Sequence, residues 1–161
     1  MFLLLILLLW GLPVAHPPPK PVLLLNATVH LGDGTTLPNA ALAITADTIS
    51  LLADARAIRM DMSYFEVVGL YGSHVYAAQL VDSADSLTWS TTNLAVPLDS
   101  GRQLVLRPPA SKPFRLREGG VATLMVTDTL VAEGSQARVL RAYLNGQAVA
   151  LPDSVEHIRC H

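Results

Sequence analysis

Hydrophobic and polar residues alternate along parts of the chain with the period of two that half-buried β-strands require. The alternation is clearest in TISLL at 48–52, and a run of similar apolar character, ALAIT at 41–45, precedes it across two residues. A longer run at 22–31 is rich in Leu and Val and ends at GDG, a strong turn signal. We therefore predict a strand over 22–31 and a tight hairpin over 41–52.

The middle of the chain is less regular. Residues 54–62 predict a short helix or an irregular crossing, and a Gly-Ser turn at 72–73 then leads into a strand, HVYAA, at 74–78. Ser, Thr, Asp and Pro are frequent from residue 82 to residue 117, and proline breaks long elements. We predict a long loop there, with one or two short strands, of which 103–106 is the better candidate.

The last third returns to the strand pattern. VATLMVT at 121–127 predicts one strand, and RVLRAYL at 138–144 and QAVAL at 147–151 flank an Asn-Gly pair. Asn-Gly between two alternating runs indicates a hairpin, because both turn positions need a positive φ. The chain has no internal repeat and no long amphipathic helix, so the expected fold class is mainly β.

Composition and charge narrow the class further. Hydrophobic residues make up 51% and charged residues 15% of the 161 residues, which suits one folded domain with a real core. Eleven Lys and Arg against 13 Asp and Glu give a net charge of -2, without the basic block of a nucleic-acid-binding protein. The single cysteine, Cys160, excludes an internal disulfide.

The first residues suggest export. MFLLLILLLW at 1–10 is apolar throughout but falls short of the roughly 20 residues that span a bilayer. It suits the hydrophobic region of a signal peptide cleaved near Ala15, although no Lys or Arg precedes it; an uncleaved anchor is the alternative. We predict a signal peptide or short hydrophobic segment at 1–16, a stiff proline-rich spacer at 17–21, and a periplasmic or extracellular location.

Three ordered segments resemble the amidohydrolase superfamily, of the imidazolonepropionase-like and dihydroorotase-like kind. They are LNATVHLGDG at 25–34 with its continuation to residue 49, VVGLYGSHVY at 67–76, and GVATLMV at 120–126 followed by RVLRAYLNGQAV at 138–149. In that family the two ends of the chain form a small composite β-sandwich beside a catalytic barrel. The resemblance implies such a sandwich over 22–151, with a long inserted loop at about 82–119 and a flexible tail at 152–161.

The departures from the family pattern argue against the family's hydrolase activity in this chain. The family continues from its second segment to an H-x-H metal pair, and no H-x-H occurs in this sequence. Residues 82–119 are also far too few for a (β/α)8 barrel, which needs about 200 residues or more. We therefore expect no (β/α)8 barrel, and we assign no catalytic, cofactor-binding or metal-binding residue. In the family the histidine that matches His74 is not a metal ligand, which implies a structural role.

Other candidate chemistry has simpler interpretations. His157 and His161 would share one helical face near Cys160, but they lie in the terminal stretch where chains usually fray. Asp33 has no ladder of calcium ligands after it. Three aspartates and three serines lie in the Ser- and Thr-rich region. The aspartates suit turns, and the serines lack the G-x-S-x-G context of a catalytic nucleophile. They are Asp82, Asp85, Asp99, Ser86, Ser90 and Ser100.

Two functional hypotheses remain. In the first, the chain is a non-catalytic remnant or paralogue that self-associates or binds a partner protein through the sandwich face that a barrel would cover. In the second, it is the non-catalytic part of a split or truncated metal-dependent amidohydrolase acting on C–N bonds, with the barrel on another chain. Neither requires a cofactor or nucleic acid, and a membrane enters only through an uncleaved N-terminal segment.

Overall fold

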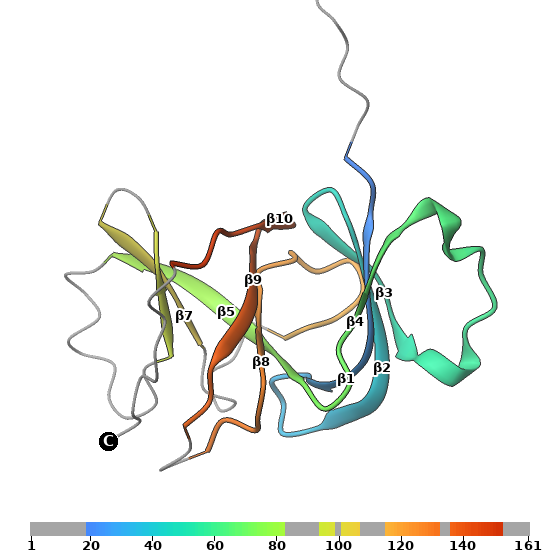
Figure 1. Cartoon of the computed structure of the whole chain (residues 1–161), viewed down its shortest axis with the longest axis horizontal. Helices are drawn as coiled ribbons and strands as arrows, with labels where there is room; N and C mark the ends of the chain where they lie inside the picture. The colour runs from blue at the N-terminus through green and yellow to red at the C-terminus, as the bar shows by residue number, and fades with distance from the viewer. Residues whose placement is uncertain (1–18, 83–93, 99–100, 107–114, 133–135, 153–161) are drawn as a thin grey trace, which may run out of the picture.

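The computed structural model describes residues 19–82, 94–98, 101–106, 115–132 and 136–152 (Figure 1). The predictions for 1–16 and for nearly all of the tail lie outside these ranges. Two single-turn 3-10 helices, η1 and η2, occur among the strands, and no helix in the described ranges could cross a membrane. The elements are β1 (Val22–His30), β2 (Thr36–Thr45), β3 (Thr48–Asp54), η1 (Ala55–Ala57), η2 (Met62–Tyr64), β4 (Glu66–Gly69), β5 (His74–Asp82), β6 (Ala95–Pro97), β7 (Arg102–Leu106), β8 (Leu124–Thr127), β9 (Val139–Leu144) and β10 (Gln147–Ala148).

The described strands belong to one mixed sheet, whose main path runs β10-β9-β8-β5-β1-β2-β3. Strand β1 is antiparallel to β2 and parallel to β4 and β5, which follow one another along its other edge. Strand β5 is antiparallel to β8 through its first half and to β7 through its second half, and β6 pairs with β7. Over the residues that the structure describes, the expectation of a mainly β chain without a (β/α)8 barrel is confirmed.

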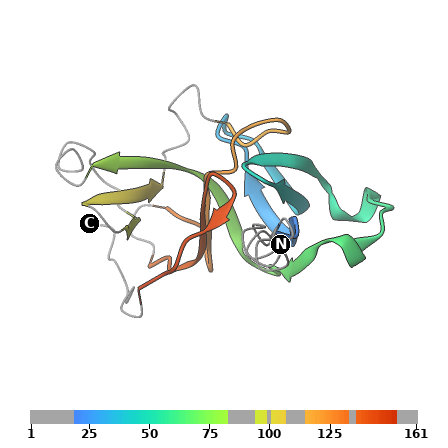
Figure 2. The same cartoon turned by 90° about the horizontal axis from the view of Figure 1, so that it is seen from above.

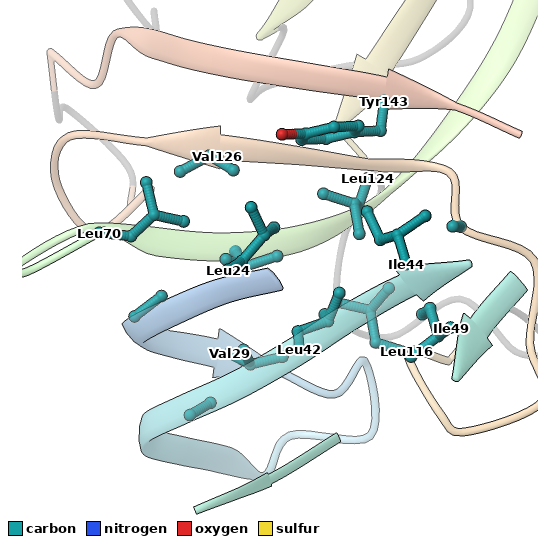
Figure 3. Close-up of a cluster of buried hydrophobic side chains, with 14 of the residues drawn as sticks. Leu24, Val29, Leu42, Ile44, Ile49, Leu70, Leu116, Leu124, Val126 and Tyr143 are labelled. Atoms are coloured by element: carbon teal, nitrogen blue, oxygen red, sulfur yellow. The ribbon is translucent and has the colours of Figure 1, made fainter. Parts of the chain in front are cut away.

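The sheet curls so that β2 and β3 face β8 and β9 across a first core (Figure 3). Leu42 of β2 and Ile49 of β3 pack in the same buried cluster as Leu124 and Val126 of β8. The chain entering β8 runs beside β3: Val121 forms a β-bridge with Thr48, and the amide of Ala122 donates to the carbonyl of Asp47 at 2.7 Å. One continuous sheet thereby supplies both layers of the sandwich.

Strand β5 separates this first core from a second one. Val75 and Ala77 point into the first core, while Tyr76 and Ala78 belong to the second. The second core also contains side chains from β6, β7, β8 and β9, and Figure 2 shows β5 extending from the curled part of the sheet toward β7. Because alternate side chains of a strand point to opposite faces, β5 contributes to both buried clusters.

A third, smaller cluster covers the outer face of β1 and β2. Leu23, Ala41 and Ala43 are buried there, and Ile58 and Phe65 from the segment around η1 and η2 pack against them. Residues 54–62 were predicted as a short helix or an irregular crossing, and they form an irregular crossing that contains η1 and ends at the first residue of η2. Asp54 caps the start of η1, because its carboxylate accepts the backbone N–H of Arg56.

Several strand limits differ from the sequence-based prediction. The hairpin forms at the predicted place, but β2 begins earlier, at Thr36, and β10 is only two residues long. The placement of Asp82 in a loop is wrong, because β5 continues to this residue and pairs it with Arg102 of β7. Local composition could not indicate this extension, since its partner strand lies beyond a Ser- and Thr-rich segment.

The turn between β9 and β10 generates a stability prediction. Gly146 has a φ of 77°, and an added Cβ would lie 1.7 Å from the carbonyl oxygen of Ala46 in the β2–β3 turn. We expect Gly146→Ala to lower the free energy of unfolding by more than about 2 kcal/mol, through backbone strain and overpacking together. Chemical denaturation measures this difference.

Gly34→Ala is the matched control. Gly34 also has a positive φ, 91°, but an added Cβ would meet nothing within 4 Å. Only the backbone penalty of about 1 kcal/mol applies there. Equal losses in the two variants would contradict the close contact between the two turns.

Candidate functional site

Three aromatic side chains gather where β1 ends and β5 begins: His30, His74 and Tyr76. The rings of His30 and Tyr76 are stacked, with centroids 4.2 Å apart and planes 9° apart. The ring centroids of the two histidines are 5.3 Å apart. We call these three residues the histidine cluster.

Strand register explains why they meet. Asn26 has a φ of 64°, and the pairing of β1 with β2 is irregular around it. After this irregularity Ala27 and Val29 point into the first core, so His30 points to the opposite face. The parallel pairing of Val29 with Val75 places His30 level with Tyr76 on the neighbouring strand.

Hydrogen bonds fix the cluster at two points. Nε2 of His30 lies 3.0 Å from Nδ1 of His74, so one of the two nitrogens donates to the other. The hydroxyl of Tyr76 accepts the backbone N–H of Val131 at 2.9 Å, and Tyr76 is only 7% exposed. The buried tyrosine thereby anchors a histidine pair that is itself partly exposed.

Burial favours the uncharged forms of the three side chains of the histidine cluster. It lowers the pKa of His30, and the charge of His74 lowers it further; burial likewise lowers the pKa of His74. Burial raises the pKa of Tyr76, although the hydrogen bond from Val131 opposes the shift. All three side chains are consequently neutral near pH 7, and each imidazole retains a lone pair.

The candidate site residues from the sequence analysis lie in different parts of the structure. His74 contacts His30 and Tyr76, and Asp82 ends β5. Asp33 accepts hydrogen bonds from the backbone and hydroxyl of Thr35 and lies 3.3 Å from the guanidinium of Arg115, a turn-like arrangement. The remaining candidates lie outside the described residues: Asp85, Asp99, Ser86, Ser90, Ser100, His157, Cys160 and His161.

Sequence reasoning did not single out His30 as a site residue. It lies 44 residues from His74, and only the parallel pairing of β1 with β5 joins them. The available signal was a histidine on each of two predicted strands, which has no meaning until the pairing is known. Within the described ranges, no group of three or more His, Cys, Asp or Glu side chains could hold a metal ion.

Comparison with known proteins identifies no family for this chain. No protein-family model and no curated protein matches the chain. One solved structure, described as a candidate prolidase from Bifidobacterium longum, is similar at 27% identity with a TM-score of 0.33. The similarity covers 37% of this chain and 15% of that one, and we draw no conclusion from it.

The lowered histidine pKa values predict a stability that falls on acidification. Unfolded histidine, with a pKa near 6.5, takes up protons more readily than the folded His30 and His74. The stability is therefore fully present well above pH 6.5, the unfolded pKa, and decreases as the pH falls through and below that value. Urea unfolding over a pH series that spans this value measures the slope.

The double variant His30→Gln/His74→Gln should flatten this part of the profile. Asp33, Asp54 and Asp61 also have lowered pKa values, from hydrogen bonds that favour their charged forms. Their contribution is lost only below about pH 4, in a separate interval. An unchanged slope just below pH 6.5 in the double variant would exclude the histidine pair as its origin.

Proposed function

We propose that this chain is a β-module without hydrolase activity that binds another protein through the unpaired edge of β4. The partner we propose is a second copy of the chain. The exposed apolar edge of β4 is the observation that carries this proposal. It follows the first of the two hypotheses from the sequence, and the relationship to the amidohydrolase sandwich and the exported location remain parts of the proposal.

The pairing of β4 leaves one side open. Among the described strands, β4 pairs with β1 alone. The amide of Glu66 donates to the carbonyl of Pro21, the residue before β1, and the amide of Leu70, the residue after β4, donates to the carbonyl of Leu25, at 2.8 Å each. The backbone groups of Val67 and Gly69 consequently point away from β1, because alternate residues of a strand face opposite sides. Such an edge is a template for another strand.

Exposed apolar side chains occur in β4 and in the residues that precede and follow it in the chain. Tyr71 is 81% exposed, Tyr64 70% and Val67 46%. The ring of Tyr71 lies close to Gly69, since a Cβ built there would be 3.7 Å from the ring. With Met60 and Met62, five of the seven exposed large hydrophobic residues in the described ranges fall between 60 and 71. Aromatic and Met side chains are enriched in protein interfaces.

The position of this edge in the family pattern also supports the proposal. The three segments that resemble the amidohydrolases correspond to β1 to β3, to β4 with β5, and to β8 through β10, all in one sheet. The second segment, which contains β4, is the one that precedes the barrel in that family. A chain without a barrel would leave surface near this segment uncovered.

A charged side chain on the outer edge of β4 tests the proposed interface. We expect the wild-type chain to form dimers at micromolar concentrations. Val67→Lys should weaken the association at least tenfold, because the added ammonium would be desolvated beside the paired strands. Sedimentation equilibrium over a concentration series gives the dissociation constant.

Leu130→Lys is the matched control, because Leu130 is 51% exposed and lies outside residues 60–71. This substitution should leave the dissociation constant unchanged. A wild-type chain that is monomeric at all concentrations, or equal weakening by the two lysines, would refute self-association through β4. Binding to a different protein at this edge would replace the second copy as the partner.

The absence of hydrolase activity is tested separately. We expect the purified chain to leave a panel of amides and lactones unhydrolysed, with and without added Zn²⁺, because no H-x-H pair occurs in the sequence. Product formation measured against buffer is the readout. Turnover that exceeds buffer and persists through repeated purification would contradict the non-catalytic role.

A further inference from the structure

We infer that His30 and His74 form a binding site for a borderline divalent metal ion, with copper(II) as the best match. The two histidines bring ring nitrogens from different strands to 3.0 Å of each other. This inference is independent of the proposed interaction through β4, which involves other residues.

The spacing of the nitrogens suits a shared metal ion. Imidazole nitrogens bind such metals at about 2.0 Å, so two of them are about 2.8 Å apart at a right angle and about 3.3 Å apart at a tetrahedral angle. The observed 3.0 Å lies between these values. The histidine that now donates must first move its proton to its other ring nitrogen, and a small turn of each ring then lets both lone pairs face one metal ion.

The surrounding structure holds both rings near this arrangement. His30 is stacked on Tyr76, whose buried hydroxyl is bonded to the backbone of Val131. His74 begins β5 and is paired on both sides, with Thr28 of β1 and with Thr127 of β8. Ligands placed on paired strands lose little conformational freedom on binding, which favours affinity.

The chemistry of the pair selects the class of metal. Metals bind the neutral form of imidazole through a ring nitrogen, and the two histidines offer one such nitrogen each. Imidazole suits copper, zinc and nickel, and copper(II) forms the most stable complexes in this series. Calcium and magnesium prefer several oxygen ligands. Because the two histidines are only partly buried, water can reach the site and fill the remaining coordination positions.

Copper(II) itself is the probe for the experiment. The full chain is used with His16, His157, Cys160 and His161 replaced by alanine, which removes the other histidines and the thiol. We expect one copper(II) per chain, with an electron paramagnetic resonance spectrum that reports two bound nitrogens. His30→Ala and His74→Ala should each weaken binding at least tenfold. Asp47→Asn, on the distant β2–β3 turn, should leave the affinity unchanged.

A second measurement does not depend on the variants folding. Zn²⁺ added to the same background chain should shift the imidazole nuclear magnetic resonance signals of both His30 and His74, and Ca²⁺ should not. Unchanged imidazole signals, a spectrum without two coupled nitrogens, or unaltered affinity in a folded His30→Ala or His74→Ala variant would overturn the inference.

Discussion

The burial of both faces of β5 is the constraint on which the rest of the structure depends. Val75 is fully buried in the first core, and Tyr76, the next residue, is 7% exposed in the second. A shift of one residue in the pairing of β5 would exchange these side chains between two cores of different shape. The register is thereby fixed against β1, β8 and β7 together, and the two cores cannot form independently.

The histidine cluster is a consequence of that register. His74 and Tyr76 share a face of β5 because Val75 occupies the other, and the parallel pairing with β1 brings His30 beside them. Tyr76 belongs both to the second core and to the ring stack, so core packing holds a partly exposed polar pair in place. Substitutions in the second core should therefore affect the positions of the histidines through Tyr76.

The outer edges of β3 and β4 differ in how they are covered. The start of β3 is covered by the chain that enters β8, with Ile49 exchanging backbone hydrogen bonds with Gly119 and Gly120, and Glu118 accepts the amide of Leu52. The outer side of β4 has no comparable cover among the described residues and carries Val67 with exposed aromatic neighbours. Proteins usually protect sheet edges, which makes this contrast a basis for the proposed interaction.

The sequence by itself determined the mainly β class, most strands and the two hairpin turns, because alternation and turn chemistry are local properties. The Asn145-Gly146 turn has the positive φ at both residues that its sequence requires. Only the tertiary structure decided the extension of β5 to Asp82, the curl of one sheet into two layers, and the meeting of His30 with His74. These features depend on which distant strands pair and in what register, and that choice follows from burying both faces of β5 at once rather than from any local pattern.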